Sequence, residues 1–314
     1  MKIIHKILQS GYFNDRPPVL MDIGASGEIN SKWKMIAPYC ICLAFDADDR
    51  EFHVSEQTNS AYRKLITFNR IVTAEPVGYT DFYLTASPFC SSLLEPEKDK
   101  LQPWIFRDLF AVEKKTRLPA ITLQESLSQA KITYIDWFKT DTQGTDLRLF
   151  TSLSPSVQSG VLMAEFEPGI LDAYKGEDKL FAVMQQMHAK GFWLSSMDVK
   201  GVQRLDARHV AGVKPYIARR IMRRTPGWAE VTYLRQAQAS SPRDYLLLIV
   251  FALLERQFGF ALEIAEAAIP GFPDISLFQH AKDEILRELQ AERRKAPLVY
   301  LKQKINQLFS HIHD

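Results

Sequence analysis

The chain has 314 residues, of which 46% are hydrophobic and 24% are charged. Its 39 Lys and Arg residues nearly balance its 37 Asp and Glu residues, which gives a formal net charge of +2. This balance disfavours a dedicated nucleic-acid-binding protein, because such proteins depend on many phosphate contacts by Lys and Arg. We therefore expect a globular protein of one large or two ordinary domains, with no nucleic-acid partner.

The cysteines and the apolar segments indicate the environment of the protein. Cys40, Cys42 and Cys90 have neither the spacing of a disulfide framework nor that of a zinc site. This favours a reducing compartment, so we expect a cytoplasmic protein. The N-terminus lacks the apolar core of a signal peptide. The longest apolar run, residues 245–254, is shorter than the ~20 residues of a spanning helix, so we expect no transmembrane segment.

The first half of the chain alternates short apolar runs with helical patterns. This is typical of a parallel sheet covered by helices, so we predict an α/β fold with a doubly wound sheet and helices on both faces. Predicted strands cover residues 19–24, 41–48, 71–77, 134–141 and 160–167. A Thr-x-x-Glu capping box at Thr122 and Glu125 predicts the start of a short helix before the fourth strand.

The second half changes from a mixed to a helical pattern. A helix is predicted over residues 177–190, where Gly191 ends it, and strands follow at 192–196 and 230–234. Only helices are predicted beyond Ser240, at residues 242–255, 258–269, 276–294 and 298–312. We therefore predict a cofactor-binding domain over residues 1–238, with an N-terminal helical segment at 1–17, and a C-terminal helical appendage over 239–314.

A glycine turn, DIGASG at residues 22–27, directly follows the first predicted strand. Gly24 and Gly27 allow a tight turn and let a ligand approach the backbone closely. About 20 residues further on, Asp46 ends the second strand, where Rossmann-like nucleotide sites have an acid that binds ribose hydroxyls. Together these features predict a nucleotide site; an ordinary strand–turn–helix connection is the alternative.

The charge of this turn indicates which nucleotide fits. Dinucleotide sites use three glycines at a helix N-terminus to bind a pyrophosphate, whereas this turn has two, flanked by Asp22 and Glu28. Negative charges suit S-adenosylmethionine, which carries a sulfonium and an ammonium group. We therefore predict S-adenosylmethionine as the cofactor.

From about residue 19 to residue 191 the chain resembles the FkbM-type family of S-adenosylmethionine-dependent methyltransferases. The resemblance is carried, in order, by VLMDIGASGEINSKW, AFDAD, CSSLLEP, ITLQESL and IDWFKTDTQGTDLRLFTSL. Its most specific element is DTQGTD at residues 141–146, which is similar to the family's Asp-x-(Gln/Glu)-Gly-x-Glu. The chain departs from the family at Asp46, where Glu-Pro is common, and at Asp146, where Glu is usual; both keep a carboxylate.

The resemblance implies a class I methyltransferase fold, Rossmann-like and seven-stranded, with an antiparallel last strand at residues 230–234. It also implies O-methylation, which in this family concerns sugar or polyketide hydroxyls. Under this resemblance, the cofactor would be held by Asp22, Gly24, Ala25, Ser26, Gly27 and Asp46.

Further candidates follow the later strands, where open α/β sheets bind their ligands. Asp141, with Gln143 beside it, could bind the cofactor's ammonium group, act as a general base or ligate a divalent ion; a helix N-cap is the alternative. Glu165 and Glu167 are candidates for acceptor binding. Ser92 is a candidate cofactor ligand or a turn residue.

The insert before the last strand supplies a second candidate base, His209, and a basic cluster around residues 214–224. Arg219 and Arg223 are expected to hold an anionic acceptor, such as a phosphate-bearing glycan or glycolipid; a solvated basic face is the alternative. The apolar helices beyond Ser240 could close over the acceptor or form a homo-oligomer.

We therefore expect a methyltransferase that acts on a small-molecule or glycan acceptor, at a hydroxyl of a carbohydrate, glycolipid or related natural product. A nicotinamide-dependent oxidoreductase is disfavoured by the missing third glycine. A non-catalytic cofactor-binding module of a glycan-assembly system is the alternative from another class.

Overall fold

The computed structural model describes residues 2–24, 30–45, 61–210, 217, 222–236 and 241–312, without the side chains of residues 295–312. The chain divides into two compact units, Phe13–Gln236 and Met1–Tyr12 together with Ala237–Asp314. The division lies close to the predicted boundary. Residues 1–12, however, belong to the helical unit and not to the sheet-containing unit with which the sequence analysis grouped them. The reason is burial, since four apolar side chains of helix α1 (Lys2–Leu8) pack inside the helical unit.

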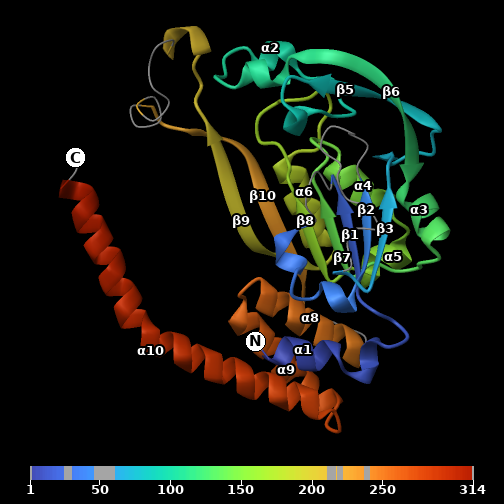
Figure 1. Cartoon of the computed structure of the whole chain (residues 1–314), viewed down its shortest axis with the longest axis vertical. Helices are drawn as coiled ribbons and strands as arrows, with labels where there is room; N and C mark the ends of the chain where they lie inside the picture. The colour runs from blue at the N-terminus through green and yellow to red at the C-terminus, as the bar shows by residue number, and fades with distance from the viewer. Residues whose placement is uncertain are drawn as a thin grey trace. The chain divides into compact units, whose positions relative to one another are not determined.

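The sheet-containing unit is built on a seven-stranded sheet with the order β3-β2-β1-β7-β8-β10-β9 (Figure 1). Its strands are β1 (Val19–Ile23), β2 (Ile41–Phe45), β3 (Lys64–Phe68), β7 (Trp137–Thr140), β8 (Met163–Phe166), β9 (Phe192–Val202) and β10 (Thr225–Arg235). β10 is antiparallel to both of its neighbours, while the pairs from β3 to β8 are parallel. The predicted α/β fold with a mostly parallel central sheet is confirmed, and so is the antiparallel last strand.

One predicted strand is corrected. The third strand of the central sheet is β3, and the predicted segment 71–77 contributes β4 (Ile71–Thr73) to a separate sheet with the order β4-β6-β5. The other members of that sheet are β5 (Tyr79–Thr85) and β6 (Val112–Thr122). β3, in which only Leu65 and Phe68 are buried, was not predicted from the sequence. In Figure 1, β5 and β6 lie across one end of the central strands.

The main core lies between the central sheet and four helices. Val19, Met21 and Ile23 of β1 share one buried cluster with Leu127 of α3 and Phe150 of α4. The four helices are α3 (Leu123–Ala130), α4 (Asp146–Ser152), α5 (Pro155–Gly160) and α6 (Leu180–Ala189). On the opposite face, Trp33 packs edge-on against Trp137 with ring centroids 5.5 Å apart. This packing fixes the strand ends at which the candidate site forms.

The predicted capping box at the start of α3 is confirmed. Thr122 Oγ1 accepts a hydrogen bond from Glu125 N at 3.1 Å, and Glu125 Oε2 accepts one from Thr122 N at 2.8 Å. Because Thr122 is also the last residue of β6, these bonds make the chain turn directly from strand into helix.

The helical unit contains α1, α8 (Pro242–Leu254), α9 (Phe258–Gly271) and α10 (Ser276–Ile312). α8 is its centre, because every side chain from Leu246 to Leu253 is buried. The sequence predicted a break between residues 294 and 298, but α10 is continuous there. None of the helices in the described part of the chain is long and apolar enough to cross a membrane.

Candidate functional site

A cavity of about 470 Å³ lies at the carboxyl ends of β1, β7 and β8 in the sheet-containing unit. β1 is where the strand order changes direction, with β2 on one side and β7 on the other. Ligands of open α/β sheets bind at such a switch point. The carboxylates Asp141 and Glu167 come from the strand ends, and much of the apolar lining comes from the segment 82–110, residues 171–173 and the first half of β10.

Gly24 brings the loop after β1 against the loop after β7. Its φ is 84°, in the left-handed region, and its N–H donates to Phe45 O at 3.0 Å. A Cβ at this position would lie 2.0 Å from the backbone oxygen of Asp141. Only glycine therefore fits here, and the two predicted site segments touch through their backbones.

Asp146 fixes the turn that carries Asp141. Its Oδ1 accepts hydrogen bonds from Thr140 Oγ1 at 2.8 Å, Thr142 Oγ1 at 2.7 Å and Thr142 N at 3.0 Å. The side chain is fully buried, and its Oδ2 has no hydrogen-bond partner among the residues described. Burial raises the pKa of Asp146 to about 6, although these hydrogen bonds by themselves lower it. Asp146 therefore stabilises the turn that positions Asp141.

Gln143 connects Asp141 to the far side of the cavity. Its Nε2 donates to Asp141 Oδ1 at 2.7 Å, and its φ of 55° is unusual for a residue other than glycine. The buried Ser92 hydroxyl donates to the Gln143 carbonyl at 2.8 Å. Tyr174 OH lies 3.3 Å from Gln143 Oε1. Ser92, predicted as a cofactor ligand, thus holds the turn in place and is not among the lining residues.

Asp141 and Glu167 form a carboxylate pair at the ends of β7 and β8, and both line the cavity. Burial, the negative charge of Asp141 and a hydrogen bond with Asp141 raise the pKa of Glu167 well above its usual value. The raised pKa favours the protonated form of Glu167 beside the charge of Asp141. The pair can therefore accept or donate a proton.

Two other predicted carboxylates have structural partners on the opposite face of the sheet. Asp22, 1% exposed, accepts a hydrogen bond from Lys139 Nζ at 2.6 Å. Glu165 accepts one from Trp137 Nε1 at 2.8 Å and pairs with Lys32 Nζ at 3.2 Å. Burial opposes the charge of Lys139, but the carboxylates around it outweigh burial and raise its pKa. Glu165 lines a second, more polar cavity of about 440 Å³, which Asp141 and Glu167 also border.

The structure brings four of the predicted residues together at the larger cavity: Gly24, Asp141, Gln143 and Glu167. His209 and Arg223 are exposed and line neither cavity. The structure therefore does not bring His209 together with the Asp141–Glu167 pair at either cavity. The remaining predicted residues, Ala25, Ser26, Gly27, Asp46 and Arg219, lie outside the described residues. The cavity lining includes Gly24 and Phe45, which directly precede residues 25–29 and 46–60.

Four aromatic side chains form one wall of this cavity, and this wall was not predicted from the sequence. It consists of Phe89 on η4 (Pro88–Cys90), Phe106 and Phe110 around η5 (Arg107–Phe110), and Trp228 on β10. The rings of Phe106 and Trp228 are nearly parallel, with an interplanar angle of 6° and centroids 6.4 Å apart. The available signal was the aromatic-rich run WIFRDLF at residues 104–110.

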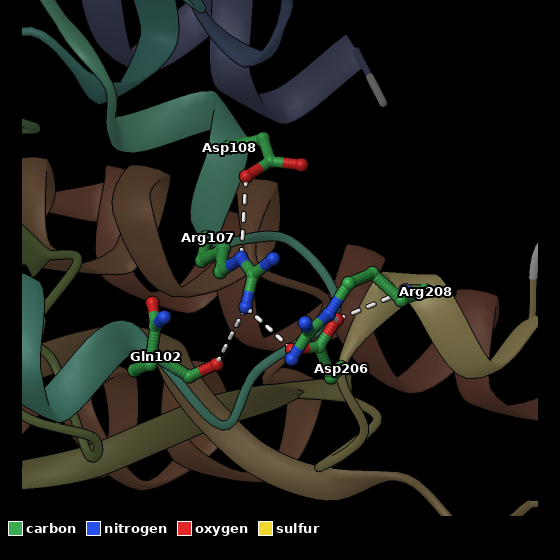
Figure 2. A network of polar contacts seen from close by, with 5 residues as sticks. All are labelled: Gln102, Arg107, Asp108, Asp206 and Arg208. Atoms are coloured by element: carbon green, nitrogen blue, oxygen red, sulfur yellow. Dashed lines mark hydrogen bonds and ion pairs between the residues drawn. The ribbon is translucent and has the colours of Figure 1, made fainter.

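An ion-pair network holds this wall against the chain that follows β9 (Figure 2). Arg107 Nη1 donates to Asp206 Oδ2 at 2.8 Å and to Gln102 O at 3.3 Å. Arg208 Nη2 donates to the same Asp206 oxygen at 2.9 Å. Hydrogen bonds from Arg208, and then from Arg107, hold the pKa of Asp206 well below its usual range. The carboxylate therefore stays ionised, and the network keeps Phe106 at the cavity.

The cavity thus combines a tight glycine turn, a pair of carboxylates and an aromatic wall. Among the described residues, no group of three or more His, Cys, Asp or Glu side chains has the geometry to hold a metal ion. Comparison of the chain with protein-family models, curated proteins and solved structures gives no match.

Gly24→Ala is expected to destabilise the sheet-containing unit by about 3 kcal/mol or more, because the new Cβ would overlap the Asp141 backbone. Gly78→Ala is the matched control, since a Cβ at Gly78 would meet no atom within 4 Å. Urea unfolding followed by circular dichroism measures both. Equal stability of the two variants would contradict the close approach.

Asp146→Asn is expected to change how stability depends on pH. Because the pKa of Asp146 is higher in the folded protein, about 6 against 3.8, the native state binds more protons than the unfolded state between these values. The wild type should therefore gain stability over the variant as the pH falls, by about 1.4 kcal/mol from pH 8 to pH 5. Urea unfolding at both pH values measures this difference, and parallel behaviour of the two proteins would refute it.

Proposed function

We propose that the chain is an S-adenosylmethionine-dependent methyltransferase with the class I fold, which methylates a hydroxyl of a carbohydrate, glycolipid or related natural product. The observation that carries the proposal is the meeting of the Gly24 turn with Asp141 and Glu167 in one cavity. The position of the antiparallel β10 between β8 and β9 supports it, because the resemblance to FkbM-type methyltransferases implies such a strand.

The residues of the cavity fit a cationic cofactor. Of the described charged residues that line it, three are carboxylates, Asp141, Glu167 and Glu177, and one is a cation, Arg70. Glu177 is neutralised by Lys179 at 2.7 Å, which leaves the Asp141–Glu167 pair to face a ligand. We propose that Asp141 binds the ammonium group of the cofactor and that the turn after Gly24 and Asp46 bind the remainder. When bound, S-adenosylmethionine supplies an electrophilic methyl group on a sulfonium sulfur.

Glu167 and Asp141 provide the proton acceptor for the acceptor hydroxyl. A hydroxyl becomes a better nucleophile as its proton leaves, and a positioned carboxylate can take that proton. The raised pKa makes Glu167 a stronger base than an ordinary carboxylate once its proton is gone. The apolar wall excludes water from the reacting groups, which strengthens electrostatic interactions inside the cavity.

Isothermal calorimetry tests the cofactor. S-adenosylmethionine, or its demethylated product, should bind to the wild type, and Asp46→Ala should weaken binding at least about tenfold because charge-assisted hydrogen bonds to the ribose are lost. Asp99→Ala, at an exposed position of α2 (Lys98–Leu101), is the control and should bind as the wild type does. Failure of the wild type to bind would overturn the proposal, and binding of a nicotinamide dinucleotide instead would indicate an oxidoreductase.

Glu167→Gln separates binding from catalysis. We expect turnover to fall by about 100-fold or more, because the proton acceptor is lost, while cofactor affinity changes less than about twofold. A wild type that binds the cofactor but methylates no acceptor would indicate a non-catalytic module.

A further inference from the structure

We propose that the acceptor is a phenol whose aromatic ring is held by the parallel rings of Phe106 and Trp228 and whose hydroxyl proton passes to the Asp141–Glu167 pair. This inference rests on the proposed methyltransferase function; among the acceptors named there, it selects a phenolic natural product over a carbohydrate or glycolipid. Both aromatic rings and both carboxylates line the same cavity.

The two rings present flat apolar faces in a common orientation. Their planes differ by only 6°, with centroids 6.4 Å apart, so a planar ring can stack on either face without reorienting the other. Phe89, Leu109 and Phe110 continue the apolar lining. Such a wall favours an aromatic ring over a sugar, because the several hydroxyls of a sugar would lose their water and gain few partners.

The stacking position is fixed next to the carboxylate pair. Trp228 pairs with Gly169, two residues beyond Glu167, and the neighbouring Ala229 N donates to Pro168 O at 3.1 Å. Phe106 packs edge-on against Phe110 at 5.1 Å, and the network in Figure 2 anchors the residue after it. The ring site and the base therefore belong to one rigid arrangement.

The acidity of the hydroxyl leads to the same class of acceptor. A phenol such as the Tyr side chain has a pKa of about 10, whereas an aliphatic hydroxyl is close to water at about 15.7. A carboxylate with a raised pKa can take a phenolic proton at a small cost in free energy. The acid dissociation constant of an aliphatic hydroxyl is more than about five orders of magnitude smaller, so its proton is much harder to remove.

The reaction balances with the cofactor as its only co-reactant. The bond between the phenolic oxygen and the methyl carbon forms while the carbon–sulfur bond breaks. The sulfonium sulfur becomes a neutral thioether, and the phenolic proton remains on the carboxylate pair until solvent removes it.

Matched acceptors test the class. A naphthol, the saturated decahydronaphthol of similar shape and a methyl glucoside are each supplied with S-adenosylmethionine, and kcat/KM is measured from formation of the methyl ether. We expect the naphthol to be preferred by about 100-fold or more, since the other two lack an acidic hydroxyl. Equal or better turnover of the glucoside or the decahydronaphthol overturns the inference, as does cofactor binding without turnover of the naphthol.

Variants of the ring site provide the second test. Trp228→Leu should raise KM for the naphthol about 3- to 10-fold with little change in kcat, and Trp228→Phe should restore most of the wild-type KM. Phe181→Leu, at an exposed position of α6 that does not line the cavity, is the control and should leave both constants unchanged. An unchanged KM in Trp228→Leu, or no recovery in Trp228→Phe, contradicts a stacking role.

Fluorescence titration of the wild type with the naphthol alone separates the two proposals. If the protein binds the naphthol but not S-adenosylmethionine, the methyltransferase proposal fails and so does the inferred reaction, while the ring site stands. If it binds S-adenosylmethionine but not the naphthol, with or without the cofactor present, only the phenol inference fails.

Discussion

The backbone contact between Gly24 and Asp141 is the constraint on which the candidate site depends. A side chain at position 24 would separate the loops after β1 and β7, and the cavity at the switch point of the sheet is built around their contact. Gln143 and Gly144, both with positive φ, continue the same turn. The buried Asp146 carboxylate stabilises this turn by accepting hydrogen bonds from the Thr140 and Thr142 hydroxyls. Backbone geometry therefore positions Asp141 before any ligand is considered.

The carboxylates at the strand ends divide into two groups. Asp22, Glu165 and Asp146 are used within the fold, through an ammonium group, an indole N–H or threonine hydroxyls. Asp141 and Glu167 line the cavity, and the charge of Asp141 adds to burial in raising the pKa of Glu167. This division leaves one carboxylate pair at the cavity, because the other carboxylates have partners within the fold. It also explains why a sequence with almost no net charge can hold an acidic site.

The parts of the fold that follow local patterns were predictable from the sequence. The Gly24 turn and the capping box at Thr122 are such features, whereas the antiparallel direction of β10 was implied only by the resemblance to a known family. β3 was missed although Ile66, Thr67 and Phe68 are of types that favour strands, because strand propensity alone does not decide which sheet a short segment joins. Buried Asp146 and cavity-lining Asp141 look alike in sequence, because burial depends on packing between distant segments. The stacking of Phe106 and Trp228 joins residues far apart in the chain, so no local pattern could indicate it.

Lys139 also determines how β7 fits into the sheet. The four residues of β7 begin with Trp137 and Phe138, which are buried on opposite faces, so hydrophobicity alone does not distinguish the two faces. Lys139 stands in register with Asp22 on one neighbouring strand and with Glu165 on the other. A slip of one residue would move the ammonium group to the helix-covered face, away from its carboxylate partners. The lysine therefore selects a single alignment of the strand and, with it, the face from which Asp141 emerges.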